Sequence, residues 1–81
     1  MHDNPVNEAF QPHGYWVFRY PNKCVWYRGE FKNGEKCGLW EWYNRYGNLE
    51  CIGEYKRNKK CGYWRWYSKD KSIIMSIFYA N

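Results

Sequence analysis

The stretch Gly38-Leu39-Trp40-Glu41-Trp42-Tyr43 occurs in three versions along this chain. Gly14-Tyr15-Trp16-Val17-Phe18 comes before it, and Gly62-Tyr63-Trp64-Arg65-Trp66-Tyr67 comes after it. The opening glycines stand at 14, 38 and 62, so the spacing is 24 residues both times. A fixed period of this size indicates a repeat architecture, in which each unit buries its apolar side chains only against its neighbours.

The second half of the unit repeats at the same spacing. Residues 29–37 align without a gap with residues 53–61. The third copy diverges at its end, where Tyr79 is in register with Phe31 and Tyr55 but no glycine precedes it. Residues 1–11 are polar, contain Pro5 and show no periodicity. We therefore expect a flexible arm over residues 1–11 and one three-repeat domain over residues 12–81.

This unit resembles the variant form of the membrane occupation and recognition nexus (MORN) repeat. In that family a Gly-x-Trp triplet opens a strand, a polar turn follows, and an aromatic-bearing second strand leads to the next Gly-x-Trp. The resemblance covers residues 14–79 and implies a scaffold that serves many partners. Bacterial proteins with this variant repeat are often antitoxins or immunity-type proteins, so the resemblance also implies a role of that kind.

Each unit is predicted to form a β-hairpin, because aromatic residues at i and i+2 share one face of a strand but are spread around a helix. Polar turns are expected at 21–23, 46–48 and 69–71, and second strands at 25–31, 49–55 and 73–79. The predicted fold is all-β, an antiparallel meander of about six strands in which stacked indoles form the core. Gly29 and Gly53 are expected to lie under a neighbouring indole. Asn33-Gly34 predicts a turn with positive φ, and Asn58-Lys59 is its weaker copy.

Charge is distributed unevenly over the 81 residues, whose formal net charge is +5. Residues 1–55 hold six Lys or Arg and seven acids, whereas residues 56–81 hold seven Lys or Arg and Asp70 alone. A C-terminal part with a net charge of +6 favours an acidic partner. The alternative explanation is a solvated face that only promotes solubility.

Several features argue against enzymatic chemistry, a cofactor or a metal site. The histidines, His2 and His13, have no partner visible in the sequence, and no glycine-rich phosphate loop is present. The four cysteines, at 24, 37, 51 and 61, lack a Cys-x-x-Cys clamp. Cys37 and Cys61 should lie two strands, or nearly 10 Å, apart, which is too far for a disulfide. Reduced thiols, the absence of a signal-peptide pattern and the lack of an apolar run of ~20 residues favour the cytoplasm.

A binding surface is predicted on the face opposite the indoles, where Tyr15, Leu39 and Tyr63 align across the sheet. Exposed tyrosine and arginine side chains are typical of interfaces. The residues expected to contact a partner are Tyr15, Tyr43, Tyr63, Arg65, Tyr67, Lys56, Arg57, Lys59 and Lys60. The alternative is a thin sheet that hides both faces as best it can. In addition, the apolar strand Ile73–Tyr79 is expected at a sheet edge, where a partner or a second copy in a homodimer would cover it.

Three functions follow from these features, in order of preference. The first is a non-enzymatic module that docks on a partner protein with an acidic surface, as a stoichiometric inhibitor of the antitoxin, immunity or anti-defence type. The second is a single-stranded nucleic-acid-binding protein that stacks bases on its aromatics and contacts phosphates with the basic segment 56–60. Binding to acidic lipid headgroups at a membrane ranks last, because no amphipathic helix or apolar anchor is evident.

Overall fold

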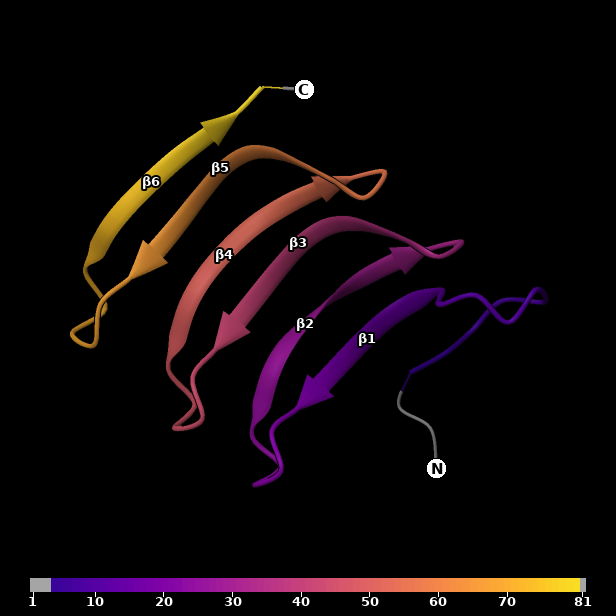
Figure 1. Ribbon diagram of the computed structural model, residues 1–81, viewed down its shortest axis with the longest axis horizontal. Coiled ribbons are helices and arrows are strands. Elements are labelled where there is room, and N and C mark those ends of the chain that lie inside the picture. The colour runs from indigo at the N-terminus through magenta and orange to yellow at the C-terminus, as the bar shows by residue number, and fades with distance from the viewer. Residues whose placement is uncertain (1–3, 81) are drawn as a thin grey trace.

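Residues 4–80 are described by the computed structural model, in which six antiparallel strands form one sheet in chain order (Figure 1). The strands are β1 (Gly14–Arg19), β2 (Val25–Lys32), β3 (Glu35–Tyr43), β4 (Leu49–Lys56), β5 (Lys59–Tyr67) and β6 (Ile73–Tyr79). The predicted all-β meander of six strands is confirmed, and the strand bounds agree within a few residues. Strong period-2 alternation of aromatic residues fixes both the strands and their faces.

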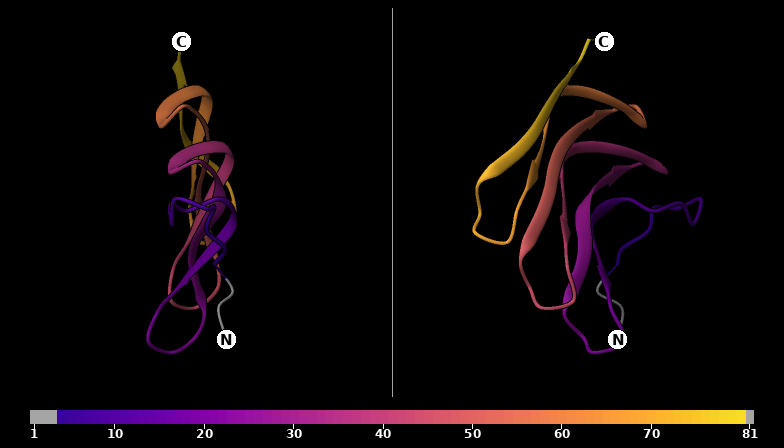
Figure 2. Two further views of the ribbon diagram at one scale, coloured as in Figure 1. Left: turned by 90° about the vertical axis from the view of Figure 1, so that its right-hand side faces the viewer. Right: turned by 60° about the vertical axis from the view of Figure 1, so that its left-hand side comes forward.

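The sheet is a single curved layer, with principal extents of 41 × 36 × 11 Å (Figure 2). Its two sides have different compositions, because successive side chains of a strand point to opposite faces. The Trp face carries Trp16, Phe18, Trp40, Trp42, Trp64 and Trp66. The Tyr face carries Tyr15, Val17, Leu39, Glu41, Tyr63 and Arg65.

The core consists of indoles that lie flat on the backbone of the neighbouring strand. Trp40 and Trp64 are 0% and 2% exposed. A Cβ added at Gly29 would overlap the ring of Trp40, and a Cβ at Gly53 would overlap the ring of Trp64. The predicted role of both glycines is therefore confirmed. Each indole nitrogen also donates a hydrogen bond of 3.2 Å to a strand carbonyl, that of Glu30 or Glu54.

Lysine side chains cover the buried indoles from the solvent side. The Nζ of Lys36 lies 5.1 Å from the centroid of the Trp40 ring and 4.9 Å from that of Tyr55. The Nζ of Lys60 lies 4.8 Å from the Trp64 ring. These cation–π contacts leave each ammonium group in water while the aliphatic stem shields the ring. A single-layer sheet thereby buries two tryptophans without a second layer.

Two-residue turns close the β2–β3 and β4–β5 hairpins. Asn33 and Gly34 have φ values of 48° and 86°, as the sequence predicts for this turn. In the second hairpin the residues with positive φ are Arg57 and Asn58, at 51° and 69°. The expected position Asn58-Lys59 is wrong by one residue, because Lys56 pairs with Lys59 and leaves only residues 57–58 between the strands.

The N-terminal segment lies along the free edge of β1. The side chain of Asn4 accepts a 2.8 Å hydrogen bond from the Val17 N–H and donates one of 3.2 Å to the Val17 carbonyl. Trp16 Nε1 donates to the Pro5 carbonyl at 2.6 Å. The flexibility expected for residues 1–11 stays a prediction, and its residues 1–3, with His2, lie outside the described part.

The cysteines occupy the positions that the repeat predicts. Cys37 in β3 and Cys61 in β5 are separated by β4, and all four thiols are free. Cys51 is buried at 7% exposure and stands opposite Trp42 and Trp66. Burial raises the pKa of the Cys51 thiol, and burial also raises that of Cys37.

In the folded protein, Cys51 should react more slowly with iodoacetamide than Cys24 or Cys61. Its thiol is buried and hard to reach, and its raised pKa lowers the thiolate fraction at pH 8. After denaturation, all four thiols should react without prior reduction. Mass spectrometry of time points followed by peptide mapping measures both. A Cys37–Cys61 disulfide in the untreated protein would contradict the strand order.

Candidate protein-binding surface

One row of exposed side chains crosses the Tyr face from β1 to β6. Tyr15 stands opposite Glu30, Leu39 opposite Glu54, and Tyr63 opposite Phe78. The four apolar members, Tyr15, Leu39, Tyr63 and Phe78, are between 51% and 62% exposed. In the first two pairs an exposed glutamate accompanies the apolar residue, whereas the third pair is apolar on both sides.

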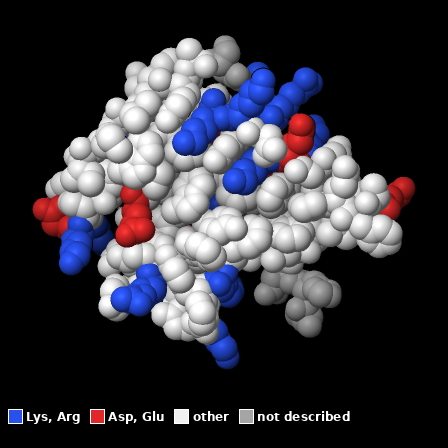
Figure 3. All heavy atoms as spheres, viewed as in Figure 1, with Lys and Arg blue, Asp and Glu red and all other residues white. Residues whose placement is uncertain are grey.

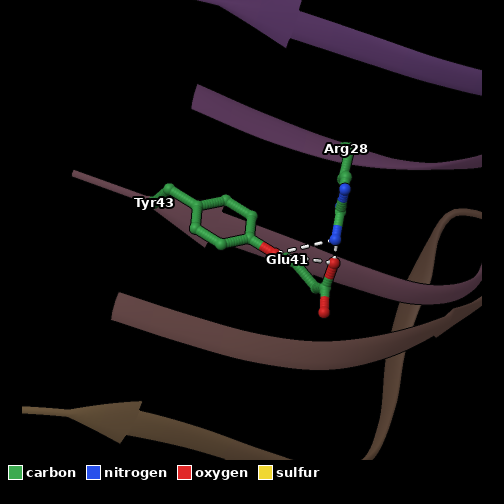
Figure 4. Close-up of polar contacts among 3 residues, drawn as sticks. All are labelled: Arg28, Glu41 and Tyr43. Atoms are coloured by element: carbon green, nitrogen blue, oxygen red, sulfur yellow. Dashed lines mark hydrogen bonds and ion pairs between the residues drawn. The ribbon is translucent and has the colours of Figure 1, made fainter. Parts of the chain in front are cut away.

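The next row contains an internal polar network on β2 and β3. Arg28 Nε lies 2.7 Å from Glu41 Oε1, and Arg28 Nη2 donates a 3.0 Å hydrogen bond to the Tyr43 hydroxyl (Figure 4). That hydroxyl donates to Glu41 Oε1 at 3.0 Å. The hydrogen bond to Glu41 raises the pKa of Arg28, and burial, followed by the Glu41 bond, raises that of Tyr43. The Tyr43 hydroxyl therefore stays protonated, and its hydrogen bonds are made within the sheet to Arg28 and Glu41.

The third repeat lacks this network. The residues equivalent to Arg28, Glu41 and Tyr43 are Ile52, Arg65 and Tyr67, so an arginine replaces the acid and an isoleucine replaces its partner. Arg65 is exposed between Ile52 and Ser76, and Arg28–Glu41 is the one ion pair within residues 4–80. The Arg65 guanidinium lies 5.6 Å from the centroid of the Tyr63 ring. β5 and β6 contain no acidic residue that could neutralise it.

The structure places the predicted contact residues in three groups. Tyr63, Arg65 and Tyr67 lie together on the Tyr face of β5. Tyr15 lies at the opposite side of the sheet on β1, and Tyr43 belongs to the polar network. The basic residues surround the β4–β5 turn.

The basic group is divided between the two faces. Lys56 and Lys59 pair across the turn, whose tip carries Arg57, and all three side chains are exposed. Lys60 is on the Trp face, with its Nζ over the Trp64 and Tyr79 rings. Figure 3 shows Lys and Arg side chains gathered at this end of the sheet. A hollow of about 720 Å³ lies between the β2–β3 turn and the β4–β5 turn. Its lining includes Lys32, Lys36, Lys56 and Arg57.

The residues expected to contact a partner on the Tyr face do not include Phe78 and Ile74, which the sequence places only in the edge strand Ile73–Tyr79. They are 59% and 66% exposed; Phe78 stands opposite Tyr63 on the Tyr face, and Ile74 lies at a bulge of β6, where Met75 pairs with Trp66 and Ile73 with Tyr67. The alternation of Phe78 with Ser76 could have indicated its face, because residues two apart share a face. The Arg28–Glu41–Tyr43 network was also missed, since its formation depends on the register of β2 against β3.

The described residues include no group of three or more His, Cys, Asp or Glu side chains placed to hold a metal ion. Within residues 4–80 no helix is long and apolar enough to cross a membrane. What the surface offers chemically is an unpaired guanidinium among exposed aromatic and aliphatic side chains.

Comparison with protein families matches the MORN repeat to two segments, residues 27–39 and 51–63. Each matched segment runs from a second strand, across a two-residue turn, into the opening strand of the next unit. Comparisons with curated proteins and with solved structures give no significant match. MORN repeats are typically protein- or membrane-binding modules, which is compatible with a non-enzymatic binding role. The two matched segments are 24 residues apart, which is the period of the repeat.

Proposed function

We propose that this protein is a non-enzymatic module that docks one partner protein, through an acidic patch of the partner, onto the β5–β6 part of its Tyr face. The observation that carries the proposal is Arg65, exposed between Ile52 and Ser76 with no acid in its own or the following strand. An arginine surrounded by tyrosine and other aromatic side chains is the composition found at interface hot spots.

The difference between the repeats supports this location. In the second repeat the equivalent side chain is Glu41, and Arg28 neutralises it within the sheet. In the third repeat, a carboxylate of the partner protein would bind Arg65 as Glu41 binds Arg28, and it could form a bidentate pair. The neighbouring Tyr63 and Phe78 would exclude water around the pair and strengthen it. The basic turn at 56–59 adds long-range attraction for an acidic surface.

The nucleic-acid alternative fits the Tyr face less well. Glu30 and Glu54 are exposed beside Tyr15 and Leu39, so a polyanion lying across these side chains would meet like charges. The basic end would then have to supply the affinity, and its Lys60 faces the other side of the sheet. A protein partner needs only the β5–β6 region and the adjacent turn.

We further propose that the module works in the cytoplasm as a stoichiometric inhibitor, of the antitoxin, immunity or anti-defence type. A sheet that consists of repeats and presents a docking face acts by covering its partner rather than by changing it chemically. The MORN repeat supports binding in general, and the inhibitory role is our extension of it.

Affinity capture of the full chain from an extract of its native cells tests the partner class. Two samples are compared, one treated with nuclease and one untreated. The proposal predicts that a single acidic protein is recovered at a constant ratio in both samples. Recovery that disappears after nuclease treatment, with tight, salt-sensitive binding to generic oligonucleotides, would contradict it in favour of the alternative.

Single substitutions on β5 should weaken binding of the captured partner most. We expect Tyr63→Ala, Arg65→Ala and Tyr67→Ala each to cost more than about 1 kcal/mol, or roughly fivefold in Kd. Tyr46→Ala is the matched control, because Tyr46 is 77% exposed and lies in the β3–β4 turn, outside the strands. Calorimetric titration at fixed salt measures the difference. Equal affinities for Tyr46→Ala and the three β5 variants would contradict the proposed surface.

Replacing Lys56, Arg57 and Lys59 together with alanine should mainly lower the association rate, since rim charges steer the encounter. The double substitution of Lys69 and Lys71, in the turn at the other end of β5, is the charge control. If the basic-turn variant abolished binding while the β5 variants did not, the interaction would be mainly electrostatic, as expected for nucleic acid.

A further inference from the structure

The outer edge of β6 combines exposure with a complete lack of charge. No Asp, Glu, Lys or Arg occurs from residue 72 to residue 80. Ile73, Ile74, Met75, Ile77 and Phe78 are all more than one third exposed. β6 pairs with β5 on one side, and no strand of residues 4–80 pairs with its other side (Figure 1). Exposed edges of this composition are normally covered, because their free N–H and C=O groups recruit another strand.

The opposite edge of the sheet is not available to cover it. At the middle of β1 the N–H and C=O of Val17 point outward, and the Asn4 side chain bonds both of them. Residues 4–6 therefore occupy the place where a further strand would pair with β1. This contact disfavours a head-to-tail array in which β6 of one copy pairs with β1 of the next.

β6 also cannot accept another repeat of the same kind. Gly29 and Gly53 let Trp40 and Trp64 lie flat on the preceding hairpin, and a Cβ at either glycine would overlap the ring. The equivalent residue in β6 is Ile77, on the same face and opposite Trp64. Its branched side chain fills the space that the next indole would need. A further repeat of the same kind therefore cannot stack on β6. The outward N–H and C=O groups of β6 have no partner strand within residues 4–80.

The backbone of Ser76 points toward the open edge. Val17 and Arg28 are directly opposed, and the outward N–H and C=O of Val17 mark them as a pair that makes no mutual hydrogen bonds. Arg65 and Ser76 are the same pair in the third repeat, so the N–H and C=O of Ser76 also point away from β5. Ser76 is the central residue of Ile73–Tyr79.

We propose that two copies of the protein pair antiparallel through β6, on a two-fold axis at Ser76. In this register each Ser76 exchanges two backbone hydrogen bonds with Ser76 of the second copy. Ile74 lies beside Phe78 of the second copy on the Tyr face, and Met75 lies beside Ile77 of the second copy on the Trp face. Uncharged residues on both sides of Ser76 find uncharged partners, and no charge is buried. An acidic partner protein would gain nothing from this uncharged edge, which favours a second copy.

Charge placed at position 76 tests this register in the full-length chain. Ser76→Lys puts two like charges directly opposite one another at the two-fold axis, each beside Arg65 of its own chain, which destabilises the pair. Ser76→Glu is the complementary variant, whose carboxylate stands beside Arg65 of its own chain. Mixing the two variants puts Lys opposite Glu. Multi-angle light scattering over a concentration series measures the mass, and thermal unfolding of each variant shows that it is folded.

The unsubstituted protein should change from the mass of one chain to that of two as concentration rises. Ser76→Lys alone should remain at the mass of one chain, and its equimolar mixture with Ser76→Glu should recover the mass of two. A protein that stays at one chain throughout would overturn the proposal. So would dimers of Ser76→Lys as stable as those of the unsubstituted chain. The inference concerns the sheet edge and does not rest on the proposed function, since binding of the captured partner is measured separately.

Discussion

Trp40→Ala is expected to unfold most of the protein at room temperature. Removing a buried tryptophan costs roughly 3–5 kcal/mol, and a domain of 81 residues has little more stability than that. Trp40 is 0% exposed and donates a hydrogen bond to the Glu30 carbonyl. Its aromatic contacts are Tyr27, Phe31, Trp42 and Tyr55. The substitution therefore removes the packing that joins β3 to β2 and β4 on the Trp face.

Far-UV circular dichroism during heating measures this loss. Trp26→Ala is the matched control, because Trp26 is 46% exposed and its removal leaves the buried indoles in place. The control should unfold with a midpoint much nearer to that of the unsubstituted protein. If Trp40→Ala melted as late as Trp26→Ala, the stacked indoles would not be the core.

Gly53→Ala should cause the second largest loss of stability, although it adds only a methyl group. The new Cβ would overlap the ring of Trp64, so the indole must leave the backbone on which it lies. Overpacking of this kind typically costs 1–3 kcal/mol, and the displaced ring also loses its bond to the Glu54 carbonyl. Gly53 has no positive φ, so the alanine backbone itself is not strained.

Urea denaturation of Gly53→Ala and Gly47→Ala separates the two effects of replacing a glycine. Gly47 has a φ of 90° with nothing within 4 Å of an added Cβ, so its substitution strains the backbone without a clash. We expect Gly53→Ala to be the less stable of the two, with a lower tryptophan fluorescence midpoint. The reverse order would mean that Trp64 does not need the glycine.

Much of the fold could be predicted from the sequence because local pattern and repeat agree. Aromatic rings two residues apart determine the faces of β1, β3 and β5, and the 24-residue period transfers each assignment to the next unit. The role of Gly53 followed from the same alignment, since a glycine within a strand marks a close approach of another group. The second turn falls at Arg57-Asn58 rather than at Asn58-Lys59, because Lys56 pairs with Lys59 and this pairing is not visible in the local sequence.

The candidate surface could be predicted only in outline. Tyr63 and Arg65 were assigned to one face by alternation, which the strand preserves. Lys60 was expected with the basic turn, but β5 begins at Lys59, so alternation sends the Lys60 side chain to the Trp face. Tyr43 was expected to be available to a partner. Its bonds to Arg28 and Glu41 depend on a bulged register that a single sequence does not reveal.

Photo-cross-linking from position 63 tests most directly whether the Tyr face docks a partner. A benzophenone amino acid replaces Tyr63, and the same amino acid at Tyr46 or Phe10, which are 77% and 84% exposed, serves as the control. After irradiation in an extract of the native cells, we expect one covalent adduct with an acidic protein from position 63. We expect no such adduct from position 46 or 10. An adduct with the same protein from a control position, and none from position 63, would show that the Tyr face does not dock the partner.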